Sequence, residues 1–218
     1  MTSADPFSPG EFDPWAETYD HDVIALNRFP FDGYDRALET VVKQAAPEPG
    51  MSVLDIGTGT GNLALRFAEH GSELWCSDFS ESMLEKARKK LPQAHFVLHD
   101  LRADWPAELD RRFDRVVSAY VFHHFDLDGK VGLCRELVAH HLAPKGRLVI
   151  ADLSFQNQME MDAFAVSVGD LWEAEPYWLV EESLPALEQA DLKVDYVKVS
   201  RCAGVYSISV MRKFKIST

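Results

Sequence analysis

The chain has 218 residues, and its 46% hydrophobic content is enough to bury one sizeable core. Its 22 Lys plus Arg against 35 Asp plus Glu leave a formal charge of −13, which repels phosphate backbones and anionic lipid, so we expect no nucleic acid and no membrane as partner. The sequence contains no basic and then apolar leader and no apolar run of about 20 residues, and its three cysteines form no CxxC pair. We therefore expect a cytoplasmic protein with reduced thiols.

Residues 1–46 are expected to form a lead-in and a helical cap. The first ten residues contain two Pro and one Gly, which predicts a frayed start. From Trp15 to Ala46 the pattern is helical, but Pro30 and Gly33 interrupt it, so two short helices are expected. We therefore place the start of the main domain, residues 47–218, at the turn that ends with Gly50.

Strand and helix patterns alternate after this turn. The predicted strands are Met51–Ile56, Glu73–Ser77, His95–His99, Asp114–Tyr120 and Arg147–Leu153, and the helices between them are Asn62–His70, Glu81–Leu91 and Gly129–Leu142. Such alternation is typical of a parallel sheet covered by helices on both faces, and the fold class is α/β. The remaining predicted elements are two helices, Gln156–Glu173 and Val180–Ala190, and two strands, Lys193–Ser200 and Val205–Arg212, whose tight link predicts an antiparallel hairpin.

The first predicted strand runs into the segment V-L-D-I-G-T-G-T-G-N, in which Gly57, Gly59 and Gly61 alternate with threonines. In an open α/β sheet this loop lies at the carboxyl ends of the strands, and the helix after it offers free N–H groups to an anion. The spacing is one residue shorter than the G-x-G-x-x-G of dinucleotide-binding loops, which disfavours NAD. A tight turn that binds nothing is the alternative interpretation of the loop taken alone.

Three acids accompany the loop. Asp78 ends the second predicted strand, where a carboxylate can accept hydrogen bonds from ribose hydroxyls. Asp55 adds a negative charge beneath the loop, which favours a ligand bearing an ammonium over one bearing a pyrophosphate. Asp100 follows the third strand, where a carboxylate could meet an adenine amino group. Together they predict an adenosine ligand without a pyrophosphate.

Five segments in order resemble the motifs of class I S-adenosylmethionine-dependent methyltransferases: V-L-D-I-G-T-G-T-G-N, S-D-F-S-E-S-M-L, H-D-L, F-D-R-V-V-S-A-Y-V-F-H-H-F and L-A-P-K-G-R-L-V-I-A-D. The resemblance extends from Trp15 to the C-terminus, and within the family it is nearest to small bacterial methyltransferases of unassigned substrate. It implies a three-layer Rossmann-like sandwich whose mostly parallel seven-stranded sheet has the order 3-2-1-4-5-7-6, with the last strand antiparallel. It also implies S-adenosyl-L-methionine as cofactor and S-adenosyl-L-homocysteine as product.

The resemblance also implies roles for individual residues. Gly57 and Gly59 would contact the methionine part of the cofactor, Asp78 the ribose, and Asp100 with Leu101 the adenine. Phe79 would lie against the adenine ring, and Tyr19, in the segment W-A-E-T-Y-D, would close over the cofactor. The full set of expected cofactor residues is Tyr19, Asp55, Gly57, Gly59, Gly61, Asp78, Phe79, Asp100, Leu101 and Ser118.

The expected reaction moves a methyl group to a small-molecule acceptor by in-line displacement. His123 and His124 are the candidate bases, and hydrogen bonding to backbone is the alternative role of either. Because neighbouring residues of an extended segment face opposite ways, we expect only one of them to reach the ligand. The sequence shows no third ligand at metal spacing, so no metal is expected. Asp152, at the end of the fifth predicted strand, either orients the substrate or is a solvated acid.

Several aromatic residues are candidate substrate contacts, with ordinary packing as the alternative for most of them. They are Tyr120, Phe122, Trp172 and Tyr177.

Two other functions remain open, an NAD(P)-dependent Rossmann oxidoreductase and a non-catalytic S-adenosylmethionine-binding protein. The sequence does not decide between a monomer and a homodimer, or among oxygen, nitrogen, carbon and sulfur as the accepting atom.

Overall fold

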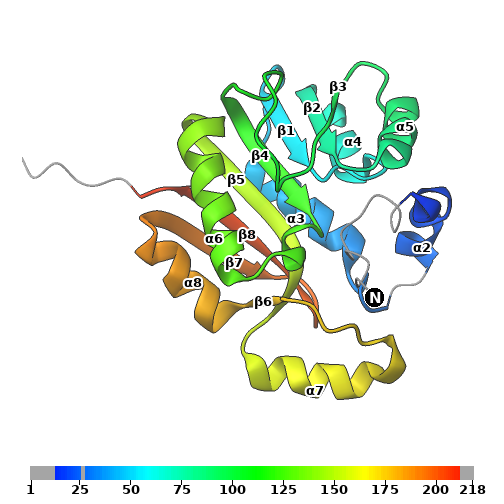
Figure 1. Cartoon of the computed structure of the whole chain (residues 1–218), viewed down its shortest axis with the longest axis vertical. Helices are drawn as coiled ribbons and strands as arrows, with labels where there is room; N and C mark the ends of the chain where they lie inside the picture. The colour runs from blue at the N-terminus through cyan, green and yellow to red at the C-terminus, as the bar shows by residue number, and fades with distance from the viewer. Residues whose placement is uncertain (1–12, 26–27, 212–218) are drawn as a thin grey trace, which may run out of the picture.

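A mixed β-sheet with helices on both faces forms the centre of the computed structural model, which describes residues 13–25 and 28–211 (Figure 1). The frayed start predicted for the first ten residues and the predicted strand end at Arg212 lie outside these residues. The strands are β1 (Ser52–Ile56), β2 (Glu73–Asp78), β3 (His95–Leu98), β4 (Phe113–Ala119), β5 (Leu142–Phe155), β6 (Trp178–Leu179), β7 (Leu192–Lys198) and β8 (Ala203–Val210).

The strand order is β3-β2-β1-β4-β5-β8-β7, and the short β6 pairs with β5 off this path. Strands β1 to β5 pair in parallel, whereas β8 runs antiparallel to both β5 and β7. The order and the antiparallel last strand predicted from the sequence are therefore confirmed. The sheet has eight strands rather than seven, because Trp178 and Leu179 add the two-residue strand β6 beside Ser154 and Phe155.

The predicted helices are present with shifted ends. They are α3 (Tyr34–Ala45), α4 (Asn62–Glu69), α5 (Glu81–Lys90), α6 (Leu127–Glu136), α7 (Gln158–Val168) and α8 (Val180–Gln189), together with α2 (Tyr19–Ala25) and the short turns η1 (Pro14–Glu17), η2 (Phe122–His124), η3 (Leu137–His141) and η4 (Gly169–Leu171). Helix α6 begins before Gly129 because the Asp126 carboxylate caps it by accepting a hydrogen bond from the Gly129 N–H. Helix α7 ends at Gly169, whose positive φ of 57° leaves the helical conformation.

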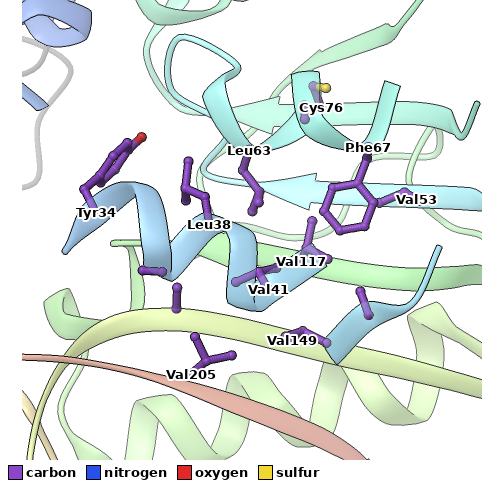
Figure 2. Packing of buried hydrophobic residues seen from close by; sticks show 14 of the residues in the cluster. Tyr34, Leu38, Val41, Val53, Leu63, Phe67, Cys76, Val117, Val149 and Val205 are labelled. Atoms are coloured by element: carbon purple, nitrogen blue, oxygen red, sulfur yellow. The ribbon is translucent and has the colours of Figure 1, made fainter. Parts of the chain in front are cut away.

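Alternate strand residues face two different helical layers, as expected for a sheet buried on both sides. Val53, Val117 and Val149 pack against α3 and α4, where Leu38 and Phe67 cover them (Figure 2). Their strand neighbours, such as Leu54, Val116 and Leu148, lie in a second core with α6 and α8. The sheet is therefore enclosed along its length, and its strand ends remain available for a site.

The N-terminal elements have two different positions. Helix α3 packs on β4, β5 and β8 and is part of the layer that covers the sheet, whereas η1 packs on α5 (Figure 1). Helix α2 is tied to the glycine loop through Asp20, which accepts a hydrogen bond from the Thr60 hydroxyl at 2.6 Å. The domain boundary proposed after residue 46 remains a prediction. Within the described ranges, no helix has both the length and the apolar character of a membrane span.

Candidate functional site

A cavity of about 890 Å³ lies at the carboxyl ends of β1, β2, β3 and β4, where the sequence placed the site. Its walls are the segments that follow these strands, together with η1, α2 and residues 170–177. The predicted site residues that line it are Tyr19, Gly57, Gly59, Asp78, Phe79, Asp100, Leu101, Tyr120, His123, His124 and Tyr177. Side chains that are distant in the sequence thus meet around one space.

Three predicted cofactor residues lie beneath the cavity rather than in its wall. Asp55 is only 1% exposed and accepts a hydrogen bond from the Thr58 hydroxyl at 2.7 Å. Ser118 is fully buried, and its hydroxyl donates to the carbonyl of Ile56. Gly61 has no room for a side chain, since an added Cβ would lie 3.2 Å from the Ala87 Cβ. These residues shape the glycine loop from below.

Two predicted substrate residues also lie outside the cavity wall. Phe122 is completely buried in the core that α6 and α8 share with the sheet. Trp172 stacks on Phe29, with ring centroids 5.4 Å apart, and packs edge-on against Tyr177. Both therefore contribute packing, the alternative that the sequence left open, while Tyr177 carries the aromatic surface that reaches the cavity.

The first two glycines of the loop are required for different reasons. Both have positive φ, 64° for Gly57 and 54° for Gly59, a conformation that side chains disfavour. A Cβ on Gly57 would lie 2.3 Å from a methyl carbon of Val121, so the glycine loop approaches the segment after β4 too closely for any side chain at this position. A Cβ on Gly59 would meet no atom of the described residues within 4 Å, because this residue faces the open cavity. Gly59 thus leaves its space to a ligand.

Asp78 joins the end of β2 to the loop. Its carboxylate accepts hydrogen bonds from the Gly59 N–H at 2.8 Å and from the Ser80 N–H at 2.9 Å. Burial raises the pKa of Asp78 to about 6 and that of Asp55 to about 7, since a low-dielectric surrounding disfavours the charged form. Asp55 Oδ1 is buried and has no hydrogen-bond partner among the described residues. The loop therefore rests on two buried acids that a nearby positive charge would stabilise.

The segment after β3 contributes Asp100, Leu101 and Arg102 to the cavity wall. Asp100 forms a paired interaction with Arg102, whose guanidinium lies 2.7 Å from one carboxylate oxygen and holds the pKa of Asp100 below its usual range. Beside it, His99 lines the cavity and is nearly buried, with Nε2 lacking a hydrogen-bond partner within the described part of the chain. His99 was not among the residues predicted from the sequence, although its place directly before Asp100 at the strand end was the available signal.

The two histidines after β4 both line the cavity, and the prediction that only one would reach it is wrong. The segment is the 3₁₀ turn η2 rather than an extended strand, and successive side chains of such a turn are about 120° apart instead of 180°. The rings of His123 and His124 consequently lie side by side, with centroids 4.0 Å apart.

Asp152 holds His123 in place. This acid is fully buried in β5, so the solvated role that the sequence left open does not apply. One carboxylate oxygen accepts the His123 backbone N–H at 2.7 Å, and the other lies 2.5 Å from His123 Nδ1. Asp152 also accepts a hydrogen bond from the Trp178 indole at 3.1 Å. The buried acid therefore orients the imidazole, whose Nε2 points the other way.

Glu175 is, like His99, a cavity residue that was not predicted from the sequence. Its Oε2 lies 3.4 Å from His123 Nε2 and 3.3 Å from His124 Nδ1, because residues 170–177 fold back over the η2 turn. Burial by itself lowers the pKa of His123, but the charges of Asp152 and Glu175 outweigh burial and raise it. Burial lowers the pKa of His124 to about 4. No motif marks Glu175, and its role arises only from contact between distant segments.

Tyr120 adds a further polar group to the cavity wall. Its φ of 59° is unusual for a residue with a side chain, and such strain is concentrated at functional sites. Its hydroxyl is buried without a hydrogen-bond partner among the described residues, although the side chain lines the cavity. A ligand atom at this position would satisfy the hydroxyl.

The charge of the cavity wall selects ligands as well. Six carboxyl side chains line it against two arginines: Asp22, Asp78, Asp100, Asp170, Glu173 and Glu175 against Arg28 and Arg102. This excess of acid opposes a pyrophosphate and favours a ligand with positive charge. The open space at Gly59, the unpartnered His99 nitrogen and the acidic wall together fit an adenosine ligand that carries a cationic centre.

Comparisons with known proteins agree with this geometry. Residues 53–146 match the family model described as a methyltransferase domain. An uncharacterized methyltransferase of Geobacillus kaustophilus is 34% identical over 151 residues, 67% of each chain, and one of Oceanobacillus iheyensis is 30% identical over 209 residues, 90% of this chain and 94% of the relative. Among solved structures, the complex of DhpI with SAH has a TM-score of 0.73 at 17% identity, covering 94% of this chain and 96% of that one, and this likeness supports the fold.

Proposed function

The chain belongs to the class I S-adenosylmethionine-dependent methyltransferases, and we propose that it transfers the methyl group of S-adenosylmethionine to a small-molecule acceptor bound beside His123 and His124. The observation that carries this proposal is the single cavity that contains both the glycine loop and the histidine pair. The segments around η1, α2 and residues 170–177 form part of its wall, which suits a small ligand better than a polymer.

The cofactor is assigned to the part of the cavity between the glycine loop and His99. When bound there, S-adenosylmethionine supplies an electrophilic methyl group on a sulfonium. Gly59 leaves room for the methionine part, Asp78 accepts hydrogen bonds from the ribose, and Asp100, Leu101 and Phe79 surround the adenine. Tyr19 closes the same space from α2, and the acidic wall stabilises the positive charge.

The acceptor is assigned to the other end, between Tyr120, Tyr177 and the histidines. The chain's contribution to an in-line displacement is chiefly alignment of the acceptor, which the rigid walls of the cavity provide. Where the accepting atom carries a proton, His123 is the residue placed to take it. Asp152 binds His123 Nδ1, so Nε2 is the ring nitrogen that faces the cavity. Asp152 is thus a positioning residue, and the Tyr120 hydroxyl is available to hold a polar atom of the acceptor.

Partners and location follow from charge and cysteines. The formal charge of −13 supports the proposal that neither nucleic acid nor membrane is the substrate. Cys76, Cys134 and Cys202 are all free and buried, which supports a cytoplasmic, reducing environment. A monomer or a homodimer is compatible with a cavity built from one chain.

Formation of S-adenosylhomocysteine tests the proposal. The protein is incubated with S-adenosylmethionine and pools of metabolites grouped by oxygen, nitrogen, carbon or sulfur nucleophile, with RNA and DNA oligonucleotides in parallel. We expect turnover with a metabolite pool and none with the oligonucleotides, and His123→Ala should slow it by about 10²-fold or more if that nucleophile carries a proton. Turnover with oligonucleotides alone would overturn the small-molecule assignment.

A further inference from the structure

Three potential metal ligands converge at the acceptor end of the cavity. The Glu175 Oε2 atom lies 3.4 Å from His123 Nε2 and 3.3 Å from His124 Nδ1. One ligand atom from each residue lies within 4.8 Å of the other two. Among the described residues, no other group of three or more His, Cys, Asp or Glu lies close enough together to hold an ion. From the sequence no metal was expected, because two neighbouring histidines do not easily share one ion and no third ligand stands at metal spacing. The fold brings Glu175 to the histidine pair as a third group.

The orientation of His123 matches that of a metal-binding histidine. Such histidines usually donate the N–H of their second ring nitrogen to a carboxylate, which fixes the tautomer and directs the lone pair of the first nitrogen toward the metal. Here Asp152 Oδ1 lies 2.5 Å from Nδ1, so Nε2 is the nitrogen left for an ion. The same carboxylate also accepts three further N–H groups, from the His123 backbone, the Leu153 backbone and the Trp178 indole, and is therefore rigidly held.

The other two ligands are held by local structure. The 3₁₀ turn η2 places the ring of His124 beside that of His123, which is what allows neighbouring residues to serve one ion. Glu175 precedes Pro176, whose carbonyl accepts a hydrogen bond from the buried ammonium of Lys130. The same ammonium also donates to the carbonyl of Phe125, directly after His124. Lys130 therefore joins the segment that carries the glutamate to the segment that carries the histidines.

We propose that His123, His124 and Glu175 bind one divalent transition-metal ion, with Zn²⁺ as the ion that fits best. In a tetrahedral zinc site with metal–ligand distances of about 2.0–2.1 Å, neighbouring ligand atoms lie about 3.3 Å apart. The two glutamate–histidine distances have this value, and the two histidine nitrogens lie within 4.8 Å of each other, so binding of the ion requires at most a further approach of His124, the ring that Asp152 does not hold. Two imidazoles and one carboxylate favour zinc or iron over magnesium, which prefers oxygen ligands.

The ion would give the acceptor end a defined chemistry. Three protein ligands leave a zinc coordination position open, and all three residues line the cavity, so this position is available to an oxygen or nitrogen atom of the acceptor. With the ion bound, His123 Nε2 would be a ligand rather than a base, and an acceptor hydroxyl in the open position would lose its proton to solvent more readily, which would make its oxygen a better nucleophile. This consequence rests on the proposed methyl transfer, whereas binding of the ion does not.

The test measures binding of the ion alone. The full chain, without an affinity tag, is stripped with a chelator and titrated with ZnCl₂ by calorimetry, and metal content is measured after dialysis. We expect one Zn²⁺ per chain, not displaced by excess Mg²⁺. Glu175→Gln and His124→Ala should each weaken binding by about tenfold or more. Glu175 is partly exposed, so its substitution leaves the fold intact, which thermal unfolding verifies.

His140→Ala is the matched control. His140 is exposed, and its Nε2 lies 3.9 Å from Glu136 on the surface, so it reports adventitious zinc binding by a similar pair. Unchanged binding in this variant, with loss in the other two, supports the site. Absence of stoichiometric binding, or equal loss in all three variants, overturns it. The titration contains neither cofactor nor acceptor, so such a failure would leave the proposed methyl transfer to be judged by S-adenosylhomocysteine formation.

Discussion

Gly59 has no side chain, and we expect the cofactor to occupy the space that a side chain would fill. Gly59→Ala should cost about 1–2 kcal/mol of stability because of the positive φ, and should weaken S-adenosylmethionine binding by at least about tenfold because its Cβ enters the cavity. Gly50→Ala is the control, since Gly50 also has a positive φ and no atom within 4 Å of an added Cβ, but lies in the turn before β1. Chemical denaturation and calorimetry measure both effects. Equal cofactor affinity in the two variants would contradict the assignment.

Asp78 makes cofactor binding depend on pH. Its pKa is raised to about 6 by burial, so in the ligand-free protein the carboxyl gains its charge as the pH rises through this value. Because the charged form accepts hydrogen bonds from ribose hydroxyls more strongly, affinity for S-adenosylmethionine should increase from about pH 5 to about pH 7.5. Titrations across this range should show the increase in the native protein and a smaller one in Asp78→Asn. An identical pH profile in both would exclude Asp78 as its source.

At the scale of elements, Asp20 joins α2 to the glycine loop. Asp20 accepts hydrogen bonds from the Thr60 hydroxyl and the Asn62 amide and forms an ion pair with Lys90 at 2.7 Å. Asp20→Asn should speed cofactor release by several-fold while costing about 1 kcal/mol or less in stability, because the side chain is partly exposed.

The control for this prediction is Asp35→Asn. Asp35 pairs with Arg66 and is mostly exposed, on the outer side of α3 and α4. Stopped-flow measurement of cofactor dissociation should distinguish the two, with faster release in Asp20→Asn alone. If both variants release the cofactor at the native rate, α2 does not close the site.

For the whole molecule, the cavity connects elements that are otherwise far apart, so a bound cofactor should stabilise the entire fold. Its wall includes α2, the ends of strands β1 to β4 and residues 170–177. A ligand at one hundred times its Kd adds about 2.7 kcal/mol, which for a chain of this size corresponds to a rise of about 5–10 °C in Tm. Thermal unfolding should show this rise with S-adenosylhomocysteine and none with NAD. A comparable rise with NAD would instead favour an oxidoreductase.

Most of the fold was predictable because its signals are local. Apolar strands that alternate with helices identified the α/β class, and the short link before β8 predicted the antiparallel hairpin. Gly57 and Gly59 were predicted as site residues because a backbone with positive φ close to a ligand requires glycine, and the spacing of these glycines is visible in the sequence. Strand β6 was not predicted because two residues are too few to form a pattern. The turn η2 was not predicted because the residues after β4 were expected to continue the alternating faces of an extended strand.

The sequence by itself therefore determined the alternation of strands and helices, the glycine loop and the acids at the strand ends, since each depends on neighbours along the chain, whereas the strand order was implied by the family resemblance. Only the tertiary structure decided that both His123 and His124 reach the cavity, that Asp152 is buried behind them and that Glu175 completes the cluster. Burial and pairing depend on which distant segments pack together, and no local pattern encodes the contact between residues 170–177 and the η2 turn.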